Sequence, residues 1–121
     1  MKLVLGTRKG LIQYVKTPTG WQFLKDDFTG IAVSMFHRDE YSGRWFAGLS
    51  HGHWGEKLHV SDDKGKTWTE LPTPVFPEEA DEIEDGVKAT IQLFWSMNSS
   101  KENLWIGTVP GALFNSTDGG E

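Results

Sequence analysis

Two short polar stretches of this sequence carry the side chains that could contact a ligand or take part in chemistry. The first holds two adjacent cations, which are also ordinary residues at an exposed turn. The second holds an H-x-H pair, whose spacing can place two imidazoles on one face of a strand as in some metal sites. It also holds an indole that could stack on a sugar or anchor the loop, and a carboxylate. No obvious third metal ligand lies nearby, so we expect neither a metal ion nor another cofactor. The candidates are Arg8, Lys9, His51, His53, Trp54 and Glu56.

A third stretch, residues 78–85, is strongly acidic. Its carboxylates could supply catalytic groups, but its charge density and the prolines before it are typical of a solvated loop. Residues 72–88 alone account for the net charge of −5 of the whole chain, so the remainder is neutral. A neutral remainder has no basic stripe, and we expect neither a nucleic acid nor a membrane surface as partner. The carboxylates are Glu78, Glu79, Asp81, Glu82, Glu84 and Asp85.

Residues 61–68 have the pattern S-x-D-x-G-x-T-W, which suits a tight turn between two antiparallel strands. Ser61 opens the turn, Asp63 can accept backbone N–H bonds inside it, and Gly65 can adopt the positive φ that it needs. Thr67 and Trp68 then restart a strand, with the indole free to pack between sheets. A calcium loop is the competing interpretation, but the alternating oxygen ligands and the closing glutamate are missing. We therefore expect a structural turn.

The beginning of the same motif recurs 55 positions later as Ser116, Asp118 and Gly120. The pattern resembles the Asp box of sialidase-type β-propellers. Three further stretches look like those of bacterial WD40/YVTN/BNR-like repeat proteins, also called glycosyl-hydrolase-like proteins. They are residues 6–11, 52–59 and 110–114.

Composition supports an all-β fold of many short strands. The chain has 121 residues, with six Trp and 14 Gly, and no cysteine for a disulfide framework. It has no apolar run long enough for a signal-peptide core or a membrane span, so the expected location is the cytoplasm. Four aromatic side chains are expected to be buried between sheets: Trp21, Phe36, Trp68 and Trp95.

The repeat predicts blades of four strands, A to D from inside to outside. Residues 2–25 would supply strands B to D of one blade, residues 31–71 a whole blade, and residues 88–115 strands A to C of a third. The expected domain is the N-terminal portion of an incomplete β-propeller. Its partner would be the missing remainder of the propeller or another copy of the chain. The side chains expected to lack a partner strand are Leu104, Ile106, Leu113 and Phe114.

The resemblance implies that Asp boxes lie on the face opposite the ligand site, so the B–C and D–A loops would hold the ligand-contacting residues. It favours a binding propeller for a carbohydrate or a protein, with a glycoside hydrolase of the sialidase type as the alternative. A sialidase fits less well, because its Arg-Ile-Pro motif is absent and Arg38 and Arg44 would lie on the wrong face. No nucleophile and base pair can be named from these residues.

Overall fold

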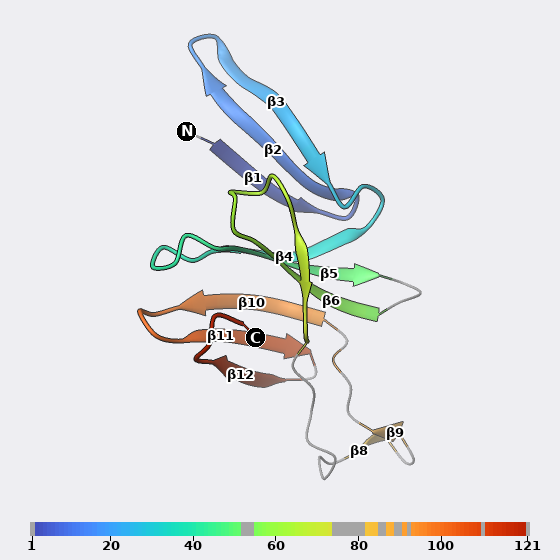
Figure 1. Cartoon of the computed structure of the whole chain (residues 1–121). Helices are drawn as coiled ribbons and strands as arrows, with labels where there is room; N and C mark the ends of the chain where they lie inside the picture. Colours follow the sequence, from blue (N-terminus) through green and yellow to red (C-terminus); the bar gives the residue numbers. More distant parts are fainter. Residues whose placement is uncertain are drawn as a thin grey trace.

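The fold consists of antiparallel β-sheets that follow one another along the chain (Figure 1). The computed structural model describes residues 2–51, 55–73, 82–84, 87–88, 91, 93–109 and 111–120. All regular secondary structure in this described part consists of β-strands, which confirms the predicted all-β class. Three sheets of three or four strands are joined by the chain in sequence order, and one two-stranded hairpin lies between the second and the third.

The first sheet has the order β1-β2-β3, with β1 Lys2–Thr7, β2 Gly10–Thr17 and β3 Gly20–Asp27. The side chains of β2 alternate between the two faces of the first sheet. Leu11 and Gln13 are buried on the side of the second sheet, whereas Tyr14 belongs to the other face and packs edge-on against Phe23 of β3. Because side chains of a strand alternate between faces, each sheet presents one face to the next sheet along the chain.

The second sheet has the order β4-β5-β6-β7, with β4 Ala32–Arg38, β5 Trp45–His51, β6 Gly55–Ser61 and β7 Thr69–Leu71. β6 and β7 pair antiparallel, so the predicted hairpin over residues 57–71 is confirmed. The third sheet has the order β10-β11-β12, with β10 Leu93–Ser99, β11 Leu104–Val109 and β12 Ala112–Ser116.

The acidic segment contains the short hairpin of β8, Glu82–Glu84, and β9, Val87–Lys88. The sequence predicted a solvated loop here. The antiparallel pairing of β8 with β9 is therefore a difference from the prediction for these residues. Residues 78–81 and 85 lie outside the described residues.

One cross-strand pair recurs at the same place in all three sheets. Gly6 faces Leu11 in the first sheet and Gly48 faces Leu58 in the second. In the third sheet, Gly107 of β11 faces Leu113 of β12. The glycines permit close approach of the next sheet: a Cβ at Gly6 would lie 3.2 Å from Val33 Cγ1 of β4, and one at Gly48 would lie 3.1 Å from Phe94 Cβ of β10.

The core consists of two apolar layers, one on each side of the second sheet. Leu11, Val33, Ala47 and Leu49 fill the layer toward the first sheet. The layer toward the third sheet contains Met35, Phe46, Leu58, Val60, Leu71, Phe94, Leu104 and Ile106. The second sheet is thus covered on both faces, whereas the first and the third each have one face that no described residue covers.

Two of the four predicted aromatic core positions are wrong. Trp21 is 45% exposed because it lies on the face of β3 that points away from the second sheet, where Lys16 lies over its ring. Trp95 is 66% exposed because the register shift between Phe94 and Ser96 turns it outward while Phe94 enters the core. Phe36 and Trp68 are half-buried and pack against the layer between the first two sheets.

The predicted open face of the third sheet also needs correction. Leu104 and Ile106 are buried, and Phe114 is half-buried, because all three face the second sheet. Only Leu113, at 67% exposure, lies on the open side. The alternation of side chains along β11 and β12 explains this division.

Candidate functional site

The turn between β6 and β7 is built from hydrogen bonds among its own residues. The Ser61 hydroxyl donates to Asp63 Oδ1 at 2.8 Å and accepts the Gly65 amide at 2.8 Å. Asp63 also accepts the Thr67 amide at 2.8 Å through Oδ1 and the Thr67 hydroxyl through Oδ2. Gly65 has φ +84°, a left-handed conformation that glycine adopts at little cost. The main-chain bond predicted for Asp63 and the positive φ predicted for Gly65 are present, whereas Thr67 and Trp68 lie before β7, which begins at Thr69.

The turn after β12 repeats this arrangement. The Ser116 hydroxyl donates to Asp118 Oδ1 at 2.7 Å and accepts the Gly120 amide at 2.9 Å. In both turns the amide of the aspartate also approaches the serine hydroxyl at 3.4 Å. The two turns therefore share a set of local hydrogen bonds on two successive sheets.

The Asp63 carboxylate is held in its charged form. Its pKa lies far below the ordinary value of 3.8, chiefly because the Thr67 hydroxyl and amide donate to it, with a further contribution from the Ser61 hydroxyl. A carboxylate that accepts this many donors acts as the polar centre of the turn. The printed bonds of Asp63 all come from residues of its own turn, as the structural interpretation from sequence expects.

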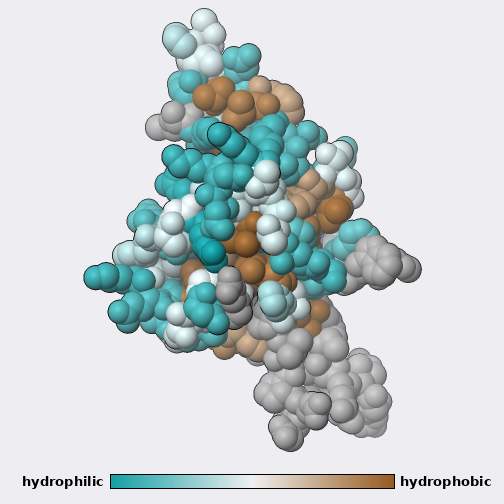
Figure 2. All heavy atoms as spheres, in the orientation of Figure 1, coloured by the Kyte–Doolittle hydropathy of each residue, from teal (hydrophilic) through white to brown (hydrophobic). Residues whose placement is uncertain are grey.

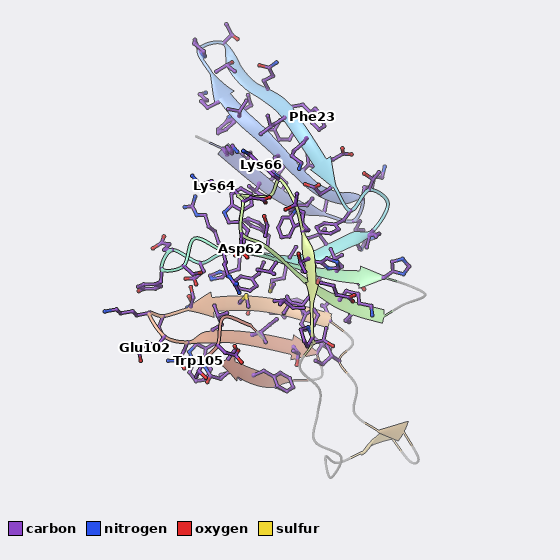
Figure 3. All side chains as sticks on the ribbon, in the orientation of Figure 1. Phe23, Asp62, Lys64, Lys66, Glu102 and Trp105 are labelled. Carbon is purple, nitrogen blue, oxygen red and sulfur yellow. The ribbon has the colours of Figure 1, made fainter. Side chains whose placement is uncertain are left out.

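Side chains from the first and second sheets contact these turns. Lys25 Nζ of β3 donates to Gly65 O at 2.7 Å and to Lys66 O at 3.3 Å. Arg44 joins the two turns, since its Nη1 donates to Gly119 O at 2.8 Å and its Nε lies 2.8 Å from Asp62 Oδ1. Figure 3 shows Asp62 and Lys66 on the β6–β7 turn, which lies toward the first sheet.

A groove of about 860 Å³ lies at the same end as the two turns. It is lined by the β4–β5 connection, the β10–β11 connection and the turn after β12. The Asp39 carboxylate at its edge is occupied locally by the Tyr41 amide and the Ser42 hydroxyl. Sequence reasoning missed this groove, because its walls come from residues far apart in the chain.

The predicted ligand-contacting residues that the structure describes, Arg8, Lys9, His51 and Glu56, lie at the opposite end. β6 and β12 run antiparallel to β5 and β11, so the ends of β5 and β11 point away from the two turns. β1 ends on the same side as β5 and β11, at the right of Figure 1. Arg8 and Lys9 form the exposed turn after β1, where the Lys9 amide donates to Thr7 Oγ1 and its carbonyl accepts the Gly30 amide.

Glu56 is the most perturbed of these residues. Its Oε1 accepts the Ser50 hydroxyl at 2.8 Å, whereas Oε2 is buried without a hydrogen-bond partner. Burial raises the pKa of the Glu56 carboxyl above its ordinary value of 4.5, and the bond from Ser50 opposes that rise. Because Oε2 has no donor in its buried position, the charged form of the Glu56 carboxyl is less well stabilised than that of a carboxylate with both oxygens bonded. Sequence reasoning named Glu56 but missed Ser50, its cross-strand neighbour.

The structure does not bring His51 and Glu56 together on one face. Ser50 and Glu56 are paired across β5 and β6 and share the face toward the third sheet, whereas the next residue, His51, belongs to the other face. His53 and Trp54 lie outside the described residues. Among the described residues, no group of three or more His, Cys, Asp or Glu side chains could hold a metal ion.

Comparison with known proteins does not connect this chain to a family. No family model matches the chain, and no curated protein matches it. Within the described part of the chain, no helix has the length and apolarity needed to cross a bilayer.

Proposed function

We propose that the three sheets are blades of an Asp-box β-propeller, and that the end bearing Arg8, Lys9, His51 and Glu56 binds a ligand. The observation that carries this proposal is the shared hydrogen-bond set of the turns at Ser61 and Ser116. The recurring Gly–Leu pair of each sheet supports it, because equivalent positions then meet the next sheet in the same way. Blades packed face to face in this manner leave their connecting loops free to vary for recognition.

The ligand end is the one opposite the two turns. At the end that holds the two turns, Lys25 and Arg44 donate to main-chain carbonyls of the turns, and the Asp39 and Asp63 carboxylates accept donors from neighbouring residues. At the ligand end, Arg8 is exposed and Glu56 Oε2 is unpaired. An exposed guanidinium can bind the hydroxyl and carboxylate groups of a carbohydrate, or the polar groups of a protein surface, and a ligand donor that reaches Glu56 Oε2 on binding would pair this buried oxygen.

The experiment is a binding screen of the whole chain against soluble oligosaccharides, both neutral and sialylated, followed by calorimetry on any that bind. Glu56→Gln and Arg8→Ala should each weaken binding by about tenfold, since each removes one polar contact. Lys101→Ala is the matched control, because Lys101 lines the groove at the other end. Binding that responds to Lys101→Ala and ignores Glu56→Gln would place the ligand at the wrong end and refute the proposal.

A glycoside hydrolase is the second candidate, and the Glu56 carboxyl is the observation that favours it. General acids of glycosidases are carboxyl groups whose pKa is raised by their surroundings. Hydrolysis of 4-nitrophenyl glycosides by the chain, lost in Glu56→Gln, would support this activity. Hydrolysis that persists in the variant would exclude Glu56 as the acid, and no hydrolysis of any glycoside would leave the binding function alone.

A further inference from the structure

We propose that Phe28 is a positioning residue for ligand binding: its ring anchors the β3–β4 connection on His59, this connection holds the Arg8–Lys9 turn, and protonation of His59 releases the anchor. The β3–β4 connection comprises residues 28–31. The inference rests on the function proposed for the Arg8–Lys9 turn, and it adds a residue and a form of regulation to that function.

The β3–β4 connection is joined to the Arg8–Lys9 turn through the main chain. The Gly30 amide donates to the Lys9 carbonyl at 2.9 Å. The two segments also lie in close contact at Gly10, where a Cβ would lie 2.7 Å from Asp27 O and 3.2 Å from Phe28 O. A displacement of the connection would therefore move the turn that presents Arg8 and Lys9.

The Phe28 side chain anchors this connection between the first and second sheets. Its ring is half-buried and lies edge-on to two aromatic rings, with centroids 5.1 Å from His59 and 5.3 Å from Trp68. The backbone of Phe28 has φ 56°, a left-handed conformation that a residue with a Cβ adopts only at a cost. Packing of the ring offsets this cost, so loss of the ring should let the connection leave this conformation.

His59 makes the anchor sensitive to pH. Its Nδ1 is buried and has no hydrogen-bond partner among the described residues. A charged imidazole carries a proton on both nitrogens, so charging this ring would place an unpaired donor in the layer between the sheets. Burial lowers the pKa of His59, with a smaller decrease from Lys57 and an opposing effect of Glu70. Proton uptake below the ordinary value of 6.5 therefore favours a state in which Phe28 has moved away and the imidazole is hydrated.

The charged side chains around His59 have partners of their own. Lys57 on β6 lies 3.3 Å from Glu70 on β7, and Lys25 lies 3.2 Å from Asp27 on the face of β3 toward the second sheet. Beside the connection, the Asp26 carboxylate accepts the Thr29 hydroxyl at 3.2 Å. These pairs leave His59 as the group whose charge changes the aromatic contact between about pH 7 and about pH 5.

NMR spectra of the whole chain test the anchor without a ligand. Phe28→Ala should shift the amide signals of residues 8–10 and speed hydrogen exchange of the Gly30 amide by about tenfold. Phe28→Tyr keeps the ring and should restore the natural signals, whereas Phe28→Asn accepts the left-handed backbone without the ring and should behave as Phe28→Ala. Phe36→Ala is the matched control, because Phe36 is half-buried in the same layer but lies against Trp45. Natural signals in Phe28→Asn, or equal shifts in Phe36→Ala, would overturn the proposal.

A pH titration tests His59 and needs no Phe28 variant to fold. In the natural chain, the signals of residues 8–10 and of Gly30 should move together as the pH falls from about 7 to about 5. His59→Gln should abolish this movement. Glu56→Gln is the control and should keep it, because Glu56 also has a raised pKa but faces the third sheet. Signals that stay fixed in the natural chain, or that move equally in His59→Gln, would overturn the proposal.

Calorimetry with a sialylated trisaccharide as the probe connects the anchor to binding. Phe28→Ala should weaken binding by about tenfold, and Phe28→Tyr and Phe36→Ala should each bind as the natural chain does. Binding that Phe28→Ala leaves unchanged would overturn the proposal and leave the proposed function standing. A natural chain that binds no sugar would count against the proposed function, and the NMR signals would still decide whether Phe28 positions the turn.

Discussion

At the scale of single residues, two carboxyl groups of this protein lie in surroundings that affect their charged forms in opposite ways. Asp63 accepts donors from two neighbouring residues, and both of its oxygens are occupied. Glu56 has one oxygen occupied by Ser50 and one buried oxygen that is not. The first arrangement stabilises the charged carboxylate, and the second opposes it. The two carboxyls should therefore respond to pH in opposite directions.

Asp63→Asn should lower the melting temperature at neutral pH, because the amide group cannot accept all the donors that the carboxylate accepts. The folded-state pKa of Asp63 lies below its ordinary value of 3.8, so the unfolded chain binds more protons and the stabilisation is lost as the pH falls below that value. Melting curves between about pH 6 and about pH 3 should fall less steeply for the variant than for the natural chain. Asp118→Asn is the matched control, and an equally large effect there would contradict the special role of Thr67.

Glu56→Gln should change the pH dependence in the other direction. Since burial raises the folded-state pKa of Glu56 above 4.5, its contribution to stability is present below that value and is lost as the pH rises through the raised pKa. Relative to the natural chain, the glutamine variant should gain melting temperature as the pH rises from about 4 to about 7. A constant difference between the two melting temperatures over this range would show that the Glu56 carboxyl is not perturbed.

At the scale of elements, the contact between sheets depends on one bulky side chain facing one glycine. Val33 of β4 lies over Gly6, and Phe94 of β10 lies over Gly48. Both side chains lie at a register shift of the first strand of their sheet. A bulge places the bulky side chain toward the preceding sheet and turns the next residue away.

Phe94→Ala should lower the free energy of unfolding by roughly 3–5 kcal/mol, because the side chain is fully buried and its removal leaves a cavity over Gly48. The neighbouring Trp95→Ala is the matched control and should change stability by less than roughly 1 kcal/mol, as expected for an exposed side chain. Urea unfolding followed by circular dichroism gives both values. A larger loss for Trp95→Ala than for Phe94→Ala would contradict the assignment of the bulge.

At the scale of the whole molecule, two sheet faces have apolar side chains and no cover among the described residues. Figure 2 shows apolar surface over the first sheet, near the top of the view. The exposed apolar residues of the first sheet include Leu3, Leu5 and Phe23, and Leu113 is exposed on the third sheet. Adjacent exposed apolar side chains on a sheet favour association with another surface.

We therefore expect the isolated chain to self-associate as its concentration rises. Phe23→Lys and Leu113→Lys should each shift light-scattering masses toward the monomer, because a charge on the apolar face opposes its burial. Tyr41→Lys provides the control, since Tyr41 is equally exposed but lies in a turn between β4 and β5. A natural chain that stays monomeric at about 100 μM would show that neither face drives association.

Much of the fold could be predicted from sequence, because the decisive interactions are local. The serine, aspartate and glycine of each turn lie within five residues, so their spacing alone predicts the hydrogen bonds of Ser61 and Ser116. The alternation of apolar residues likewise predicted most strands. The hydrogen bond of Arg44 could not be predicted in this way, since the Gly119 carbonyl that its side chain contacts lies 75 residues further along the chain.

Burial was decided by tertiary structure alone. Trp21 and Trp68 each lie beside the turn that leads into the last strand of their sheet, so this position alone does not predict which of them is more buried. The first sheet covers the face of Trp68, and no described residue covers the face of Trp21. The sequence by itself determined which residues form turns and strands, because those depend on backbone geometry and neighbouring side chains. Only the stacking of the sheets decided which side chains lose water, and hence that Glu56 has a buried, unpaired oxygen.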